Sequence, residues 1–261
     1  MDKENFEKEF LIFLKKLKQY VSDEAKNWAI KGFIDINKNI FTISTDTKIV
    51  SKILEIHIFP LISKFASDKG FDLVLADCQN YYPDMSFVCK ANHKIKYAVD
   101  IKTTYRKNAD MCNGFTLGSH GEYFTNRNSN KNIQFPYNQY KAHYCLGIIY
   151  SRNENIDETR IFNLDELDNI TSVIKDIDFF FVEKWKIASD KSGSGNTANI
   201  GSISKISDLV NGNGIFKPYG EELFDDYWMN YKKITITTKE GKTKKISKLD
   251  EFLAYRGKNK K

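Results

Sequence analysis

The apolar residues near the N-terminus repeat with the period of an α-helix. Across residues 4–20 they recur at helical spacing, with lysines and glutamates between them, at Phe6, Phe10, Phe13, Leu14 and Leu17. A second helix is predicted to begin near Asp46, a favourable N-cap residue. It is expected to run through Ile49, Ile53 and Ile56 until Pro60 kinks or ends it.

Short runs rich in β-branched and aromatic residues predict a sheet in the middle of the chain. Three runs lie at 71–76, 85–89 and 96–103, with a polar turn at 90–93, and two more lie at 146–150 and 179–187. About five strands with helices around them predict a mixed α/β, or α+β, domain.

Two segments are predicted to be loops because glycine, serine, asparagine and threonine dominate them. They span 112–132 and 189–201, and the second is expected to form neither helix nor strand. Beyond Ile236 the chain is rich in lysine, a pattern typical of a solvated tail.

Composition narrows the class of protein. A chain of 261 residues is long enough for one large domain, and its net charge of +6 mildly favours a polyanionic partner. The chain shows neither a span of apolar residues that could cross a membrane nor an N-terminal signal peptide, so we expect a cytoplasmic protein. A zinc site is not expected and a reducing compartment fits, because no C-x-x-C spacing occurs among Cys78, Cys89, Cys112 and Cys145.

The candidate chemistry lies on two neighbouring predicted strands. Pro83-Asp84 precedes one strand, and Asp100-Ile101-Lys102 follows after 15 intervening residues. Side chains alternate along a strand, so Asp100 and Lys102 are expected on one face and Ile101 on the other. A hairpin through 90–93 would bring Asp84 alongside them.

Two carboxylates without a nearby histidine or cysteine suit a hard cation such as Mg²⁺, and Mn²⁺ can replace it. A bound metal of this kind activates water and neutralises charge on a phosphoryl group, while the Lys102 ammonium would stabilise developing negative charge. Glu55, on the second predicted helix, is a candidate for an additional metal ligand. Each short motif alone is more often a turn or a solvated strand end, but their combination favours a nuclease.

The segment 193–198 reads G-x-G-x-x-A, which also matches the dinucleotide-binding fingerprint. No amphipathic helix follows it and no acidic residue ends a second strand about 20 residues later, so its context disfavours an oxidoreductase. A glycine-rich loop is equally suited to entering the DNA major groove, where asparagine can bond to adenine, and it can also be a plain surface loop.

At these residues the chain resembles the EcoRV type of type II restriction endonuclease, within the PD-(D/E)xK nuclease superfamily. The resemblance runs from about residue 32 to 231 and is carried by the segments 46–48, 79–84, 100–105, 115–118 and 193–201. It implies a central mixed β-sheet flanked by helices in a single domain, 1–261, with a small dimerisation subdomain at about 20–45 and in part of the mid-chain. It further implies a U-shaped homodimer around double-stranded DNA, a Mg²⁺ requirement, and a methyltransferase that protects host DNA.

The resemblance also implies roles for individual residues. Asp84 and Asp100 correspond to metal ligands, Lys102 to the catalytic lysine, and Glu55 to a helical glutamate that is both catalytic and metal-binding. The major-groove recognition loop corresponds to Gly193, Ser194, Gly195, Asn196, Thr197 and Asn199. A second loop, near the minor groove, corresponds to Gln79 and Asn80, and positions close to the DNA backbone correspond to Lys131, Thr47 and Lys48.

The target implied by the resemblance is GATATC, cut bluntly at its centre, where the flexible TA step can be read through DNA deformability. This chain departs from the family pattern at Cys78, Ala198 and Asn138 and in a longer loop at 119–130. Two alternatives stay open beside the oxidoreductase. They are a structure-selective or repair nuclease with the same chemistry, and a DNA-binding protein without catalysis.

Overall fold

The fold is built on a five-stranded mixed sheet. A computed structural model describes residues 1–78, 80–154, 156, 160–193, 198–237 and 241–258. The strand order is β3 (Phe71–Leu75), β4 (Met85–Cys89), β5 (Lys96–Tyr105), β7 (Ala142–Arg152) and β9 (Ile174–Glu183). Neighbouring strands are antiparallel except β5 and β7, which are parallel. The prediction of a mixed α+β domain with a central sheet is therefore confirmed.

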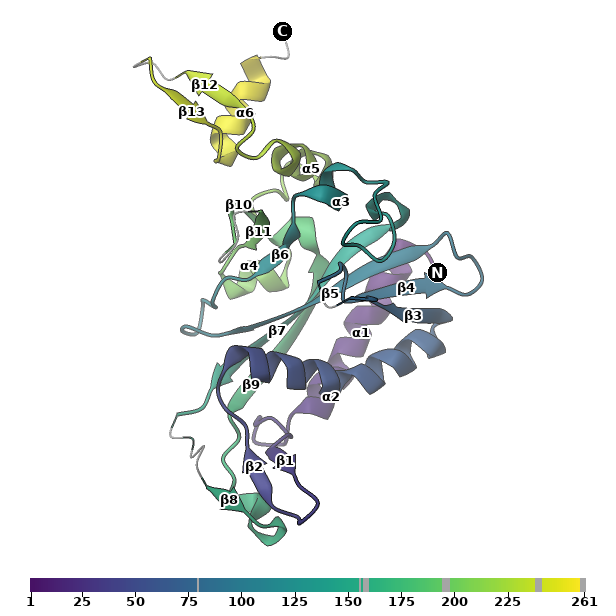
Figure 1. Ribbon diagram of the computed structural model, residues 1–261, viewed down its shortest axis with the longest axis vertical. Coiled ribbons are helices and arrows are strands. Elements are labelled where there is room, and N and C mark those ends of the chain that lie inside the picture. The colour runs from purple at the N-terminus through teal and green to yellow at the C-terminus, as the bar shows by residue number, and fades with distance from the viewer. Residues whose placement is uncertain (79, 155, 157–159, 194–197, 238–240, 259–261) are drawn as a thin grey trace.

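Two long helices, α1 (Lys3–Val21) and α2 (Thr47–Asp68), cover one face of this sheet (Figure 1). The predicted apolar face of α1 is buried, and the Phe10 ring stacks on Phe181 of β9 with centroids 3.9 Å apart. Asp46 caps α2 as expected, accepting hydrogen bonds from the amides of Lys48 and Ile49.

The expected end of α2 at Pro60 is wrong, because the helix continues to Asp68. Ile62 and Phe65, beyond the proline, are buried against the core, and this burial offsets the hydrogen bond that proline cannot make. Of the three isoleucines through which the helix was expected to run, Ile53 is buried together with Val50, Leu54 and Ile58, whereas Ile49 and Ile56 are exposed.

A second core covers the other face of the sheet. It contains a three-stranded sheet in the order β10 (Ala188–Ser192), β11 (Asn199–Ser202) and β6 (Thr116–Ser119), together with the helices α3 (Glu122–Thr125), α4 (Ile206–Val210) and α5 (Glu221–Asn230). The two segments predicted to be loops thus contribute strands that pair with each other. The strand expected at 179–187 begins and ends earlier, at Ile174 and Glu183, and the chain then turns into the 3-10 helix η3 (Lys184–Ile187).

The lysine-rich C-terminal segment forms a small folded unit where a solvated tail was expected. Strands β12 (Thr235–Thr237) and β13 (Thr243–Lys245) pair, and helix α6 (Leu249–Lys258) follows them. Burial of Ile246, Leu249 and Phe252 holds this unit on α5, and the Tyr227 hydroxyl donates to the Ser247 carbonyl at 2.9 Å.

A third sheet lies at the opposite end of the molecule from the C-terminal unit (Figure 1). It joins β1 (Gly32–Ile34), β2 (Ile40–Thr42) and β8 (Ile161–Phe162), and the 3-10 helix η2 (Leu164–Asn169) follows. A further 3-10 helix, η1 (Tyr137–Gln139), precedes β7. No helix among the described residues combines the length and apolar character that crossing a bilayer requires.

The packing of α1 predicts that two neighbouring residues contribute very differently to the free energy of unfolding. Phe10 is fully buried, whereas Leu11 is 45% exposed. Phe10→Ala should lower the free energy of unfolding by about 3–5 kcal/mol, because it removes a stacked ring and leaves a cavity. Leu11→Ala should change it by no more than about 0.5 kcal/mol. Equal losses in urea denaturation would contradict this packing.

Candidate active site

Strand pairing places the Asp84 carboxylate beside β5. Met85 pairs with Val99 in the antiparallel register of β4 and β5, which confirms the expected hairpin. Asp84 precedes Met85, and its Oδ2 accepts a hydrogen bond from the Ile101 amide at 2.7 Å. The backbone of β5 therefore orients the carboxylate of the neighbouring strand end.

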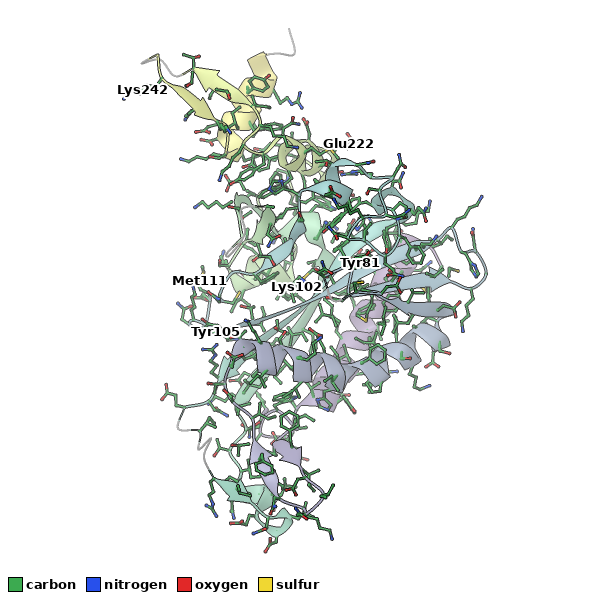
Figure 2. All side chains as sticks on the ribbon, in the orientation of Figure 1. Tyr81, Lys102, Tyr105, Met111, Glu222 and Lys242 are labelled. Atoms are coloured by element: carbon green, nitrogen blue, oxygen red, sulfur yellow. The ribbon has the colours of Figure 1, made fainter. Side chains whose placement is uncertain are left out.

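Alternation along β5 separates the reactive face from the core, as the sequence predicts. Ile101 is buried against the helices α1 and α2, while Asp100 and Lys102 project to the opposite face. The Lys102 Nζ lies 2.6 Å from Oδ2 of Asp100 and 4.0 Å from Oδ2 of Asp84. Figure 2 shows Lys102 near the middle of the molecule. Two carboxylates and one ammonium thus converge.

The electrostatics of this cluster are unbalanced towards negative charge. Burial and the Asp100 carboxylate raise the pKa of Asp84 to about 7, although Lys102 opposes the shift. Burial alone would lower the pKa of Lys102, but the Asp100 and Asp84 carboxylates outweigh burial and raise it. Lys102 therefore stays cationic at neutral pH, and Asp84 lacks a full positive partner.

The donor set fits Mg²⁺. Its oxygen ligands would come from Asp84 and Asp100, with water and substrate phosphate completing the shell, as Mg²⁺ prefers. The raised pKa of Asp84 marks a place where added positive charge would be favourable. Among the described residues, no three histidine, cysteine, aspartate or glutamate side chains converge into a larger ligand group.

The fold does not place Glu55 with Asp84 and Asp100. It lies on α2, forms an ion pair with Lys52, and is absent from the described lining of the pocket over the cluster. Ser51, one turn earlier, accepts a hydrogen bond from Thr103 of β5 at 2.7 Å, so this part of α2 does lie beside the strand that carries Asp100.

A pocket of about 500 Å³ opens over Asp84, Asp100 and Lys102. Asn80 and Asn199, both predicted to contact DNA, line it. The three predicted residues for chemistry therefore share one opening with two of the predicted DNA contacts.

The recognition loop predicted at 193–199 is described only at its two ends. The Gly193 amide donates to the Asn199 carbonyl at 2.8 Å, which closes the hairpin between β10 and β11. A Cβ at position 193 would lie 2.5 Å from Cγ2 of Thr116, so the close approach of β6 requires glycine there. The candidates outside the described residues are Ser194, Gly195, Asn196, Thr197 and Gln79.

Three further candidates lie at separate places. Lys131 forms an ion pair of 2.9 Å with Glu122, a residue at the edge of the pocket. Thr47 and Lys48 begin α2, where the Thr47 hydroxyl accepts a hydrogen bond from Arg152 at 2.7 Å and Lys48 is exposed. These two residues are not among those that line the pocket.

Sequence analysis missed Glu122 and Tyr123, which both line the pocket. They lie in a segment predicted to be a loop, and no local pattern singles them out. Their position follows from the pairing of β6 with β11, which joins residues far apart in the chain.

The raised pKa of Asp84 predicts that Asp84→Asn stabilises the metal-free protein, and that this gain in stability depends on pH. The folded pKa of about 7 exceeds the ordinary value of 3.8, so ionisation of Asp84 removes stability as pH rises through this range. Asn cannot ionise, and the variant should raise the melting temperature more at pH 8 than at pH 5. Salt should weaken the effect, since 42% of the Asp84 side chain is exposed.

Asp72→Asn is the matched control, because that carboxylate lies on β3 with 55% of its side chain exposed. Its effect on melting temperature should be the same at both pH values. A gain from Asp84→Asn that is no larger at pH 8 than at pH 5 would refute the electrostatic description.

Comparison with known proteins agrees with the fold. The family model described as restriction endonuclease EcoRV matches residues 24–257. The chain is also 37% identical over 237 residues to the type II restriction enzyme EcoRV of Escherichia coli, a match that covers 90% of this chain and 94% of that enzyme. The resemblance inferred from the motifs is thereby confirmed, and the oxidoreductase alternative is set aside. The chain belongs to the EcoRV family of type II restriction endonucleases, which are phosphodiester hydrolases acting on double-stranded DNA.

Proposed function

We propose that this endonuclease uses Mg²⁺ to cut both strands of the palindrome GATATC, leaving blunt ends. The observation that carries the proposal is the convergence of Asp84, Asp100 and Lys102 in one pocket, with the Lys102 ammonium 2.6 Å from Asp100. We also propose that Mn²⁺ can substitute for Mg²⁺ in the reaction.

The carboxylates and the lysine of the cluster have different tasks in this proposal. Asp84 and Asp100 hold the cation, which when bound supplies a Lewis acid that activates water and neutralises phosphate charge. Lys102 directs its ammonium at the scissile phosphate and stabilises the charge that develops as the bond to the leaving oxygen breaks. The Ile101 amide keeps Asp84 oriented through its hydrogen bond of 2.7 Å.

Glu55 is proposed for an outer metal position. To reach it, the side chain would leave Lys52, with which it forms an ion pair in the free protein. The exposed pair of Lys52 and Glu55 contributes little stability, so breaking it is inexpensive.

The proposed target rests on the resemblance of the run from Gly193 to Thr197 to the recognition loop of the EcoRV family. In it, Asn196 is suited to bond bidentately to the N6 and N7 atoms of adenine. The departures lie beside this run and elsewhere. Ala198 lines the pocket, Cys78 is exposed, and Asn138 donates to Asn128 at 2.7 Å.

The other proposed DNA contacts come from several parts of the chain. Asn80 and Gln79 would approach the minor groove. Lys131 would leave its ion pair with Glu122 and bind a backbone phosphate of the DNA. Lys48, exposed at the start of α2, and Thr47 are proposed to lie close to the DNA backbone.

The third sheet is proposed as the dimerisation subdomain of a U-shaped homodimer around DNA. Large apolar side chains on β1, β2, β8 and the adjoining turns are exposed, and such patches are typical of protein interfaces. Their members are Phe33, Ile34, Ile36, Phe41, Ile161, Leu164 and Leu167. A second copy of the chain would cover this surface and supply the active site for the other strand.

We further propose that the enzyme works in the cytoplasm beside a DNA methyltransferase that protects the host target. The support is its membership of a restriction endonuclease family and the four cysteines, all of which are free.

Digestion of a mapped plasmid in Mg²⁺, followed by sequencing of the ends, tests the proposed function. Blunt ends at the centre of GATATC are expected. Ends at another palindrome would refute the proposed target, while ends without a fixed sequence would favour a structure-selective or repair nuclease. Absence of cutting in both Mg²⁺ and Mn²⁺ would refute the proposed reaction.

Asp100→Ala should lower cleavage by at least about 100-fold, because it removes one of two proposed metal ligands. The protein should still bind a GATATC duplex without metal, since Asp100 carries no positive charge that attracts phosphate. Asp72→Asn, on an exposed part of β3, should cut like the natural protein. Cleavage by Asp100→Ala at the natural rate would contradict the assignment.

A further inference from the structure

A second lysine is buried beneath the candidate active site. Lys184 begins η3, directly after β9, and only 3% of it is exposed. Its Nζ finds no hydrogen-bond partner among the described residues. Burying an ammonium without hydrogen bonds is expensive, so its surroundings must compensate in another way.

Aromatic rings provide that compensation. The Lys184 Nζ lies 4.7 Å from the ring centroid of Tyr82, 4.7 Å from that of Tyr137 and 5.4 Å from that of Phe124. The faces of such rings attract a cation, and the attraction is stronger when the cation is desolvated. We call these three rings and the ammonium the lysine cage.

The acidic residue next to Lys184 forms its ion pairs with other lysines. Glu183 is turned to the other side, where it pairs with Lys3 of α1 at 2.5 Å and with Lys186 at 2.9 Å. Burial lowers the pKa of Lys184 to about 8, and the Asp100 carboxylate favours the charged form. At neutral pH the cage therefore holds a cation, and the candidate active site contributes to keeping it charged.

One ring of the cage belongs to the segment that carries the metal-binding carboxylate. Tyr82 precedes Asp84 by two residues, and its backbone amide and carbonyl are tied to Asn132 and Gln134 at 3.1 and 2.8 Å. Its hydroxyl lies 3.0 Å from Nδ1 of His143, whose Nε2 lies 3.2 Å from the Tyr137 carbonyl. The Tyr82 ring and the Asp84 carboxylate are thus carried by one short stretch of backbone.

Burial and the Lys184 charge keep the pKa of His143 well below its ordinary value, so the imidazole is neutral. A neutral ring that donates from Nε2 to the Tyr137 carbonyl accepts a hydrogen bond from the Tyr82 hydroxyl at Nδ1. The cation thus also favours the hydrogen bond that fixes the Tyr82 ring.

We propose that Lys184 is a positioning residue of this endonuclease, whose caged ammonium holds Tyr82 and thereby the Pro83-Asp84 segment in the geometry that the reaction needs. This inference rests on the proposed function. Lys184 itself does not line the pocket, so it acts through Tyr82 and Asp84 and not on DNA directly.

Lys184→Met tests the proposal, because methionine keeps an apolar stem and removes the charge. Single-turnover cleavage of a GATATC duplex should fall by about 10- to 100-fold, the cost of a small misplacement of reacting groups. The half-maximal Mg²⁺ concentration should rise. Affinity for the same duplex, measured in Ca²⁺, should change by less than about threefold, since phosphate contacts govern it.

Lys186→Met is the matched control on the same turn. Its ammonium pairs with Glu183 and lies outside the lysine cage, so cleavage and Mg²⁺ dependence should be unchanged. Equal cleavage by the Lys184 and Lys186 variants would overturn the proposal. So would losses of cleavage and duplex affinity by the same factor in Lys184→Met, which a general disturbance of the fold would produce.

Phe124→Leu provides a second measurement should Lys184→Met not fold, since it removes one cage ring and retains an apolar side chain. Its single-turnover cleavage should fall below that of the natural protein, with duplex affinity unchanged. A folded Phe124→Leu protein with the natural rate and Mg²⁺ dependence would overturn the proposal. If the natural protein itself cuts no DNA, the proposed function fails.

Discussion

The antiparallel pairing of β4 with β5 is the constraint on which the candidate active site depends. It places the residue before Met85 next to Asp100, and the hydrogen bond from the Ile101 amide then orients the Asp84 carboxylate. The apolar side chains of β5 on the other face bind the strand to α1 and α2. A one-residue slip would turn Asp100 and Lys102 into that core, so burial of one face determines the chemistry of the other.

Positive charge is distributed around the two carboxylates at different depths. Lys102 contacts them directly, whereas the lysine cage lies behind Tyr82 and influences them through the fold. The raised pKa of Asp84 shows that these cations do not fully balance the buried negative charge. A cluster in this state destabilises the free protein slightly and favours a divalent cation, which is a common compromise between stability and function.

The central sheet and the site were predictable because their signals are local. Strand runs, alternation at Asp100 and Lys102, and the hairpin at 90–93 all appear within short stretches. What could not be predicted depends on partners distant in the chain. Strands β6 and β11 pair although about 80 residues separate them in the chain. The C-terminal unit folds because Phe252 packs against buried side chains of α5. Lys184 gave no signal, since a single lysine after a strand looks like any exposed lysine.

The most direct test of the account is to locate a bound Mn²⁺ by anomalous scattering in crystals of the protein with a GATATC duplex. The account predicts a peak held by oxygens of both Asp84 and Asp100 beside the scissile phosphate, with the Lys102 ammonium close to that phosphate. A metal bound elsewhere, with Asp84 and Asp100 free of it, would contradict the account.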